Sequence, residues 1–151
     1  MTSPSHSDIR LFMRLEPDIP KLTHQNGIEP FVRKNGKPGM RKTRELLNLE
    51  AKFVSLLHKN KPPKPWKCPI HLTTIWKFCA PKDLVFGPKQ LEWKTTKPDT
   101  DNLVKALKDC LKFAGYYVDD ALVSLDTIGK VWVPEDAEHG VEIRLHDLTD
   151  E

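Results

Sequence analysis

The sequence predicts a single α+β domain in which helices pack on a small mixed β-sheet. Four segments alternate apolar and polar side chains, as half-buried strands do, and two others repeat apolar residues at helical spacing. The predicted order of strand, helix, strand, helix, strand, strand is typical of an α+β domain. With 151 residues, the chain can form one domain with a substantial core and is too short for two comfortable ones.

The first half of the chain is expected to contain a strand, an irregular segment and a helix. Residues 9–15 alternate and predict the first strand, and the polar residues 1–8 before it predict a disordered tail. Prolines and glycines punctuate residues 17–39, which indicates a loop or an irregular hairpin. A stripe of leucines and phenylalanine predicts a helix over 42–58, and the proline-rich segment that follows ends it.

The second half is expected to supply most of the sheet. Residues 70–78 are fairly apolar on both faces, which places this strand at the centre. Residues 81–96 read as a loop, and 99–114 read as a helix that a glycine ends. The segments 121–133 and 140–146 are predicted as a strand pair joined by a turn.

Composition excludes several classes of protein. The N-terminal segment has no apolar stretch that could serve as a secretory signal or a membrane span, so we expect a cytoplasmic protein. Three cysteines without Cys-x-x-Cys spacing argue against a disulfide framework and a zinc ribbon. Cys110 falls on the apolar face of the predicted helix and is expected in the core, and the six histidines show no ligand spacing.

Charge is distributed unevenly along the chain. Residues 1–98 hold 19 Lys and Arg against 8 Asp and Glu, a net charge of +11, and residues 99–151 hold 5 against 13, a net charge of −8. The basic part is a candidate surface for phosphate backbones, and Lys94, Lys97 and Lys130 are the lysines we expect to contact DNA. Any single lysine could instead be an ordinary solvated side chain.

The stretch from Lys97 to Lys105 combines carboxylates and lysines around a helix start. Asp99 is the expected cap, Asp101 lies in the first turn, and the positive end of the helix dipole favours both as ions. Asp119 and Asp120 follow the helix. Carboxylates that converge without an excess of base indicate a divalent cation, which prefers hard oxygen ligands.

Ordinary structural roles are the alternative for each of these residues. Aspartates at helix starts are usually caps, and an Asp-Asp pair before a strand is usually a solvated turn. Lys105 could pair with Asp101 or Asp109 as an exposed helix bridge worth roughly half a kcal/mol or less.

Residues 97–132 resemble the RusA family of Holliday junction resolvases. The motif Asp99-x-Asp101-Asn-Leu-x-Lys105, followed by Asp119-Asp120 and later Lys130, carries the resemblance. It implies a RusA-like endonuclease domain over residues 1–151, with Asp99, Asp101 and Asp120 as catalytic metal-binding aspartates and Lys105 as a catalytic lysine. It also implies a homodimer that uses Mg²⁺, or Mn²⁺ in its place, to cut four-way DNA junctions by paired nicks in recombination and repair.

One departure from the family concerns the approach to the first aspartate. An arginine run precedes the first aspartate in the best-known member. In this chain the segment from Lys94 to Lys97 carries less positive charge at the same place. The alternatives to junction resolution are a nuclease for flaps or other branched DNA, a non-catalytic DNA-binding protein, and, ranked last, a nucleotide pyrophosphohydrolase.

Overall fold

A five-stranded sheet with strand order β1-β7-β4-β6-β5 organises the fold. The structure is a computed structural model, and it describes residues 6–15 and 27–149. The strands are β1 (Ile9–Arg14), β4 (Ile70–Cys79), β5 (Glu92–Trp93), β6 (Val123–Val133) and β7 (Gly140–Asp147). β4 and β6 run parallel and the other neighbours antiparallel, so the sheet is mixed, as predicted.

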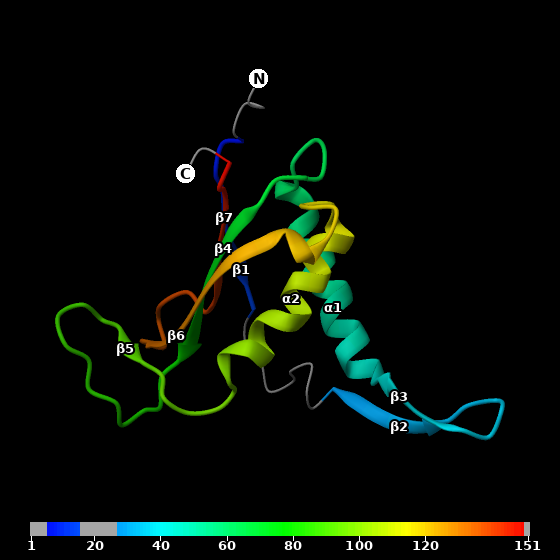
Figure 1. Ribbon diagram of the computed structural model, residues 1–151. Coiled ribbons are helices and arrows are strands. Elements are labelled where there is room, and N and C mark those ends of the chain that lie inside the picture. The colour runs from blue at the N-terminus through cyan, green and yellow to red at the C-terminus, as the bar shows by residue number, and fades with distance from the viewer. Residues whose placement is uncertain (1–5, 16–26, 150–151) are drawn as a thin grey trace.

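Two helices cover one face of this sheet (Figure 1). They are α1 (Arg44–Leu57), continued by a 3-10 turn at His58–Asn60, and α2 (Thr100–Ala114). The apolar stripe of α2, which includes the buried Leu107 and Cys110, packs in one core with the buried face of β4. This packing confirms the α+β class and the core position of Cys110.

A second, two-stranded sheet stands apart from the first. It is the hairpin formed by β2 (Ile28–Val32) and β3 (Pro38–Lys42), which extends away from the N-terminal end of α1 (Figure 1). The expected hairpin is therefore present between residues 28 and 42. Residues 17–26 of the expected irregular segment lie outside the described residues.

The predicted pairing of the last two strands is wrong. β6 and β7 both pair with β4, which lies between them, and the connection 134–139 passes the end of β4. Alternation of apolar side chains identifies strands but does not determine their neighbours. The central position of β4 is confirmed, because it is the strand that both β6 and β7 flank.

Residues 6–8, assigned from the sequence to a disordered tail, are held against the sheet. The Asp8 carboxylate accepts hydrogen bonds from Arg144 at 2.6 and 2.8 Å and from His146 at 2.7 Å. The His6 ring stacks on Trp66. The partners in these contacts are more than 50 residues away in the sequence, which is why composition alone predicts a tail. Among the described residues, no helix is long and apolar enough to cross a membrane.

Candidate active site at the two ends of helix α2

Asp99 stands at the N-cap position of α2 without capping it. Its side chain makes no capping hydrogen bond, and both carboxylate oxygens accept hydrogen bonds from the Lys97 ammonium at 2.9 Å. The usual structural role of an aspartate at a helix start is therefore absent. The carboxylate is half exposed and already attracts a cation.

Asp101 and Lys105 are exposed on the first two turns of α2. Within residues 27–149, no ion pair joins Lys105 to Asp101 or to Asp109, although the spacing permits both bridges. Neither side chain is used by the local fold. Both are accessible to ligands from solvent.

Lys130 and Lys94 fix the segment that leads to Asp99. The Lys130 ammonium donates to the carbonyls of Thr96 and Pro98, the latter at 2.8 Å. The Lys94 ammonium donates to the Thr96 hydroxyl at 2.6 Å and lies 3.9 Å from the centre of the Trp132 ring. Two lysines thus position the backbone that carries the first aspartate.

The three lysines that were expected to contact DNA differ in their exposure and in their contacts. Lys94 is only 7% exposed, and burial, together with the nearby charge of Lys130, lowers the pKa of its ammonium. In this structure the Lys94 ammonium contacts the loop and the Trp132 ring. Lys130 is half-buried and engaged with the same loop, whereas Lys97 is exposed.

Asp119 and Asp120 lie beyond the other end of α2. Gly115 adopts a left-handed conformation at φ 94° that ends the helix, and the chain then turns into the 3-10 helix Asp120–Leu122. Asp119 caps this short helix, because its carboxylate accepts from the Ala121 amide at 3.0 Å. This hydrogen bond, a second one with Asp120 and the charge of Lys112 lower the pKa of Asp119.

A buried tyrosine lies among further carboxylates near this end. The Tyr117 hydroxyl donates to the Lys108 carbonyl at 2.7 Å. Burial, followed by the negative charges of Asp120, Asp109 and Asp126, raises the pKa of this hydroxyl. Sequence reasoning missed Tyr117 as part of the acidic group, and the only signal was its place two residues before Asp119.

The two acidic pairs lie far apart within one chain. α2 has 15 residues, which at about 1.5 Å per residue separates its ends by about 22 Å. β6 runs back along α2 (Figure 1), since Asp126 pairs with Lys108 and Lys130 reaches Pro98. Asp120, which precedes β6, therefore lies towards the C-terminal end of α2.

The expected convergence of Asp99, Asp101 and Asp120 is therefore not found in a single chain. Among the described residues, three metal-ligating atoms come within 4.8 Å of one another at a different place, formed by His6, Cys68 and Asp147. The sequence placed Asp120 correctly at the start of the returning strand. It did not show that the return begins a full helix length from Asp99.

Fold and site together define a class of protein: an α+β domain that presents carboxylates and lysines at a helix N-terminus, as nucleases that act with a divalent cation do. The family model described as endodeoxyribonuclease RusA matches residues 24–146. The chain belongs to the RusA family, and the expected family membership is confirmed.

A relative in a bacteriophage agrees with this assignment. The chain is 32% identical over 94 residues to a protein of Lactococcus phage r1t named crossover junction endodeoxyribonuclease rusA. The aligned region covers 61% of this chain and 66% of the relative, so it spans just under two thirds of the relative's length.

Proposed function

We propose that this chain is a metal-dependent endodeoxyribonuclease that resolves four-way DNA junctions as a homodimer. The observation that carries the proposal is the start of α2, where the exposed carboxylates of Asp99 and Asp101 serve no capping role and lie beside lysines. Membership of the RusA family and the name of the phage relative support the reaction class and the substrate.

The carboxylates at this end of α2 fit a hard divalent cation. Asp99 binds the Lys97 ammonium through both oxygens, and Asp101 is exposed in the next turn. Mg²⁺, or Mn²⁺ in its place, would be held by Asp99, Asp101 and an Asp120 carboxylate. When bound, such an ion lowers the pKa of a water molecule and neutralises charge on the attacked phosphate.

The lysines of the site would have different roles. Lys105 presents its ammonium one turn from Asp101, where it can stabilise negative charge that develops on the phosphate. Lys130 and Lys94 hold the loop backbone, so that the aspartates are positioned before DNA binds. Lys97, exposed beside Asp99, would contact a phosphate.

A second copy of the chain would complete the site. Asp120 lies towards the C-terminal end of α2, a helix about 22 Å long, and is too far from Asp99 in one chain to share an ion. A twofold dimer with two α2 helices side by side and antiparallel brings the partner subunit's Asp120 to Asp99 and Asp101, and does so twice. Two equal sites suit paired nicks in a four-way junction.

The hairpin β2–β3 adds a basic arm to the DNA-binding surface. Arg33, Lys34 and Lys37 are exposed at and beside its tip. Arg41 is held by Glu29 at 3.0 Å and lies 5.3 Å from the centre of the Phe31 ring. An arm that projects from the domain with this charge can follow a phosphate backbone.

One cleavage assay tests the function. The protein is incubated with a four-way junction, a flap and a linear duplex of matched sequence, with Mg²⁺ and with a chelator. We expect paired nicks in the junction with Mg²⁺ and none with the chelator. Faster cutting of the flap would make the protein a flap nuclease, and tight junction binding without cleavage would leave a DNA-binding protein.

A further inference from the structure

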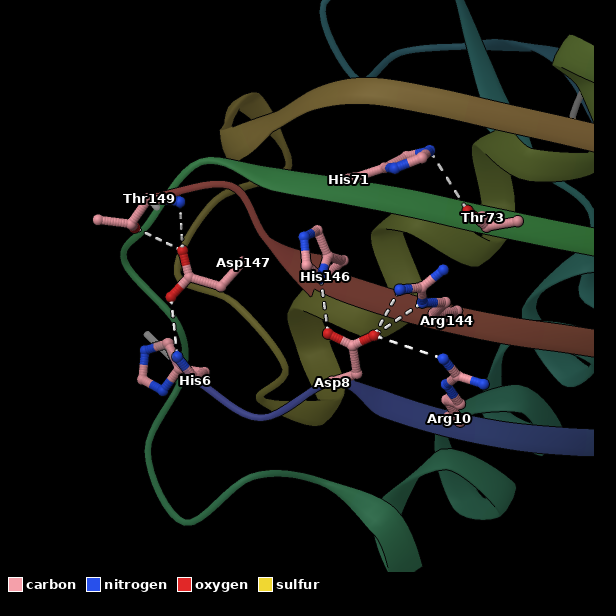
Figure 2. A network of polar contacts seen from close by, with 9 residues as sticks. All are labelled: His6, Asp8, Arg10, His71, Thr73, Arg144, His146, Asp147 and Thr149. Carbon is pink, nitrogen blue, oxygen red and sulfur yellow. Dashed lines mark hydrogen bonds and ion pairs between the residues drawn. The ribbon is translucent and has the colours of Figure 1, made fainter. Parts of the chain in front are cut away.

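Three side chains with different donor atoms meet at the end of the sheet where β1 and β4 begin and β7 ends. His6 precedes β1, Cys68 precedes β4, and Asp147 ends β7. One ligand atom of each, a ring nitrogen, a thiol sulfur and a carboxylate oxygen, lies within 4.8 Å of the others. Figure 2 shows His6 and Asp147 side by side, next to the ion-paired Asp8.

Asp147 is a buried carboxylate at the end of β7. It is 4% exposed, and in the described part of the chain no lysine or arginine pairs with it. Its oxygens accept hydrogen bonds from the His6 amide at 3.0 Å and from the Thr149 amide at 2.8 Å. Buried charges in proteins are usually paired or bound to metals.

The His6 side chain is held in place by its contacts with the fold. The His6 ring stacks on Trp66 at 4.7 Å between centroids and 11° between planes. Backbone hydrogen bonds to Tyr116 and from Val118, at 3.0 and 3.1 Å, fix Trp66 in turn. The Asp8 ion pairs with Arg144 anchor the chain two residues after His6 (Figure 2).

The geometry points to a transition-metal site formed by His6, Cys68 and Asp147, suited to Zn²⁺ and separate from the nuclease site. Nitrogen, sulfur and oxygen donors are the set that Zn²⁺ accepts, and Mg²⁺ does not favour thiolate. In tetrahedral Zn²⁺ sites neighbouring ligand atoms lie roughly 3.4 to 3.6 Å apart. Binding therefore needs only a small closure of this group, and it leaves a fourth position for water.

Metals bind cysteine as the thiolate, so binding of a zinc ion at Cys68 would release the thiol proton to the buffer. The ion would tie the N-terminal segment, the linker before β4 and the end of β7 together.

Calorimetric titration of the full-length protein with Zn²⁺, in the presence of Mg²⁺, tests the site. We expect one ion per chain, release of about one proton in buffers of different ionisation enthalpy, and a higher Tm. Cys68→Ser and His6→Ala should each weaken binding by about a hundredfold or more, since even the groups that support a ligand are worth 10- to 100-fold.

Matched variants separate this site from other sources of binding. Cys79→Ser and His58→Ala change an exposed cysteine and an exposed histidine elsewhere, and they should bind Zn²⁺ as the parent does. Asp101→Asn should also bind Zn²⁺ normally, because the nuclease site is distinct. The site is overturned if no Zn²⁺ binds, if Cys68→Ser and His6→Ala retain parental affinity, or if Asp101→Asn or Cys79→Ser abolishes binding.

Discussion

The two ends of α2 carry the same residue type and use it differently. At the N-terminal end, Asp99 does not cap the helix and binds an ammonium, and Asp101 is exposed. At the C-terminal end, Asp119 caps the 3-10 helix that begins at Asp120. Asp119 therefore has a local structural role that Asp99 and Asp101 lack.

The helix dipole adds an electrostatic difference between the two ends of α2. The N-terminal end of α2 is positive and stabilises nearby anions, whereas the C-terminal end is negative and repels them. The charge of Lys112 offsets this repulsion at Asp119. A divalent cation shared between opposite ends of two antiparallel helices would stabilise the C-terminal acidic pair as well.

The largest expected effect comes from Asp101→Asn. Loss of a metal ligand should slow single-turnover junction cleavage by about a thousandfold or more, because the bound ion contributes several kcal/mol to the transition state. Junction binding should stay within a few-fold or tighten, since one negative charge facing phosphates is removed. Cleavage and binding are measured on the same preparation.

Asp136→Asn is the matched control, because Asp136 is an exposed aspartate in the connection between β6 and β7. It should cleave as the parent does. Mg²⁺-dependent nicking retained by Asp101→Asn would remove this residue from the site and erase the contrast between the two helix ends.

Lys105→Met tests the cation beside the aspartates. As a group that stabilises charge on the phosphate, its loss should slow single-turnover cleavage by about a hundredfold. Stability should fall by about half a kcal/mol or less, because no helix bridge within residues 27–149 is lost. Lys52→Met, on the exposed face of α1, is the control. Equal cleavage rates for the two variants would mean that Lys105 is an ordinary surface residue without a role in cleavage.

Lys130→Met tests positioning rather than direct contact. Loss of its hydrogen bonds to the Thr96 and Pro98 carbonyls should cost roughly 2 kcal/mol of stability. Displacement of Asp99 should slow cleavage by about tenfold, less than for Lys105→Met. Thermal unfolding and single-turnover kinetics measure both effects, and a slower rate at unchanged stability would mean that Lys130 contacts the substrate instead.

The smallest effect separates Lys97 from Lys94. Lys97→Gln should lower the slope of log affinity against log salt by about 0.9, the value for one lost phosphate contact. Lys94→Gln should leave the slope unchanged and lower the Tm, because this buried lysine supports the loop. Binding titrations at several salt concentrations decide between them, and a reversed pattern would contradict the division of roles.

Sequence periodicity predicted most of the fold, and the exceptions have physical reasons. The helix over 99–114, the central strand and the returning strand were all predictable from apolar spacing. Strand order was not, because β4 lies between two strands that are consecutive in sequence. Composition predicts a tail for residues 6–8, because their partners, such as Arg144, come from distant segments.

The candidate site was predictable in composition but not in geometry. The motif from Asp99 to Lys105 could be read from spacing, and Gly115 correctly marked the reversal after α2. The burial of Lys94 could not be predicted from the sequence, since it depends on Trp132 from another strand. The separation of Asp120 from Asp99 follows from the direction in which β6 packs along α2, which no local pattern encodes.

Subunit complementation tests most directly whether the two ends of α2 meet across a dimer. Asp101→Asn and Asp120→Asn are each expected to be inactive, and are mixed after joint unfolding and refolding. In a shared site, a mixed dimer has one site with both native aspartates, so random pairing should restore about a quarter of the parental sites. Restored Mg²⁺-dependent nicking of that order is the predicted result. No recovery, with mixed dimers shown to form by mass, would contradict a site shared between subunits.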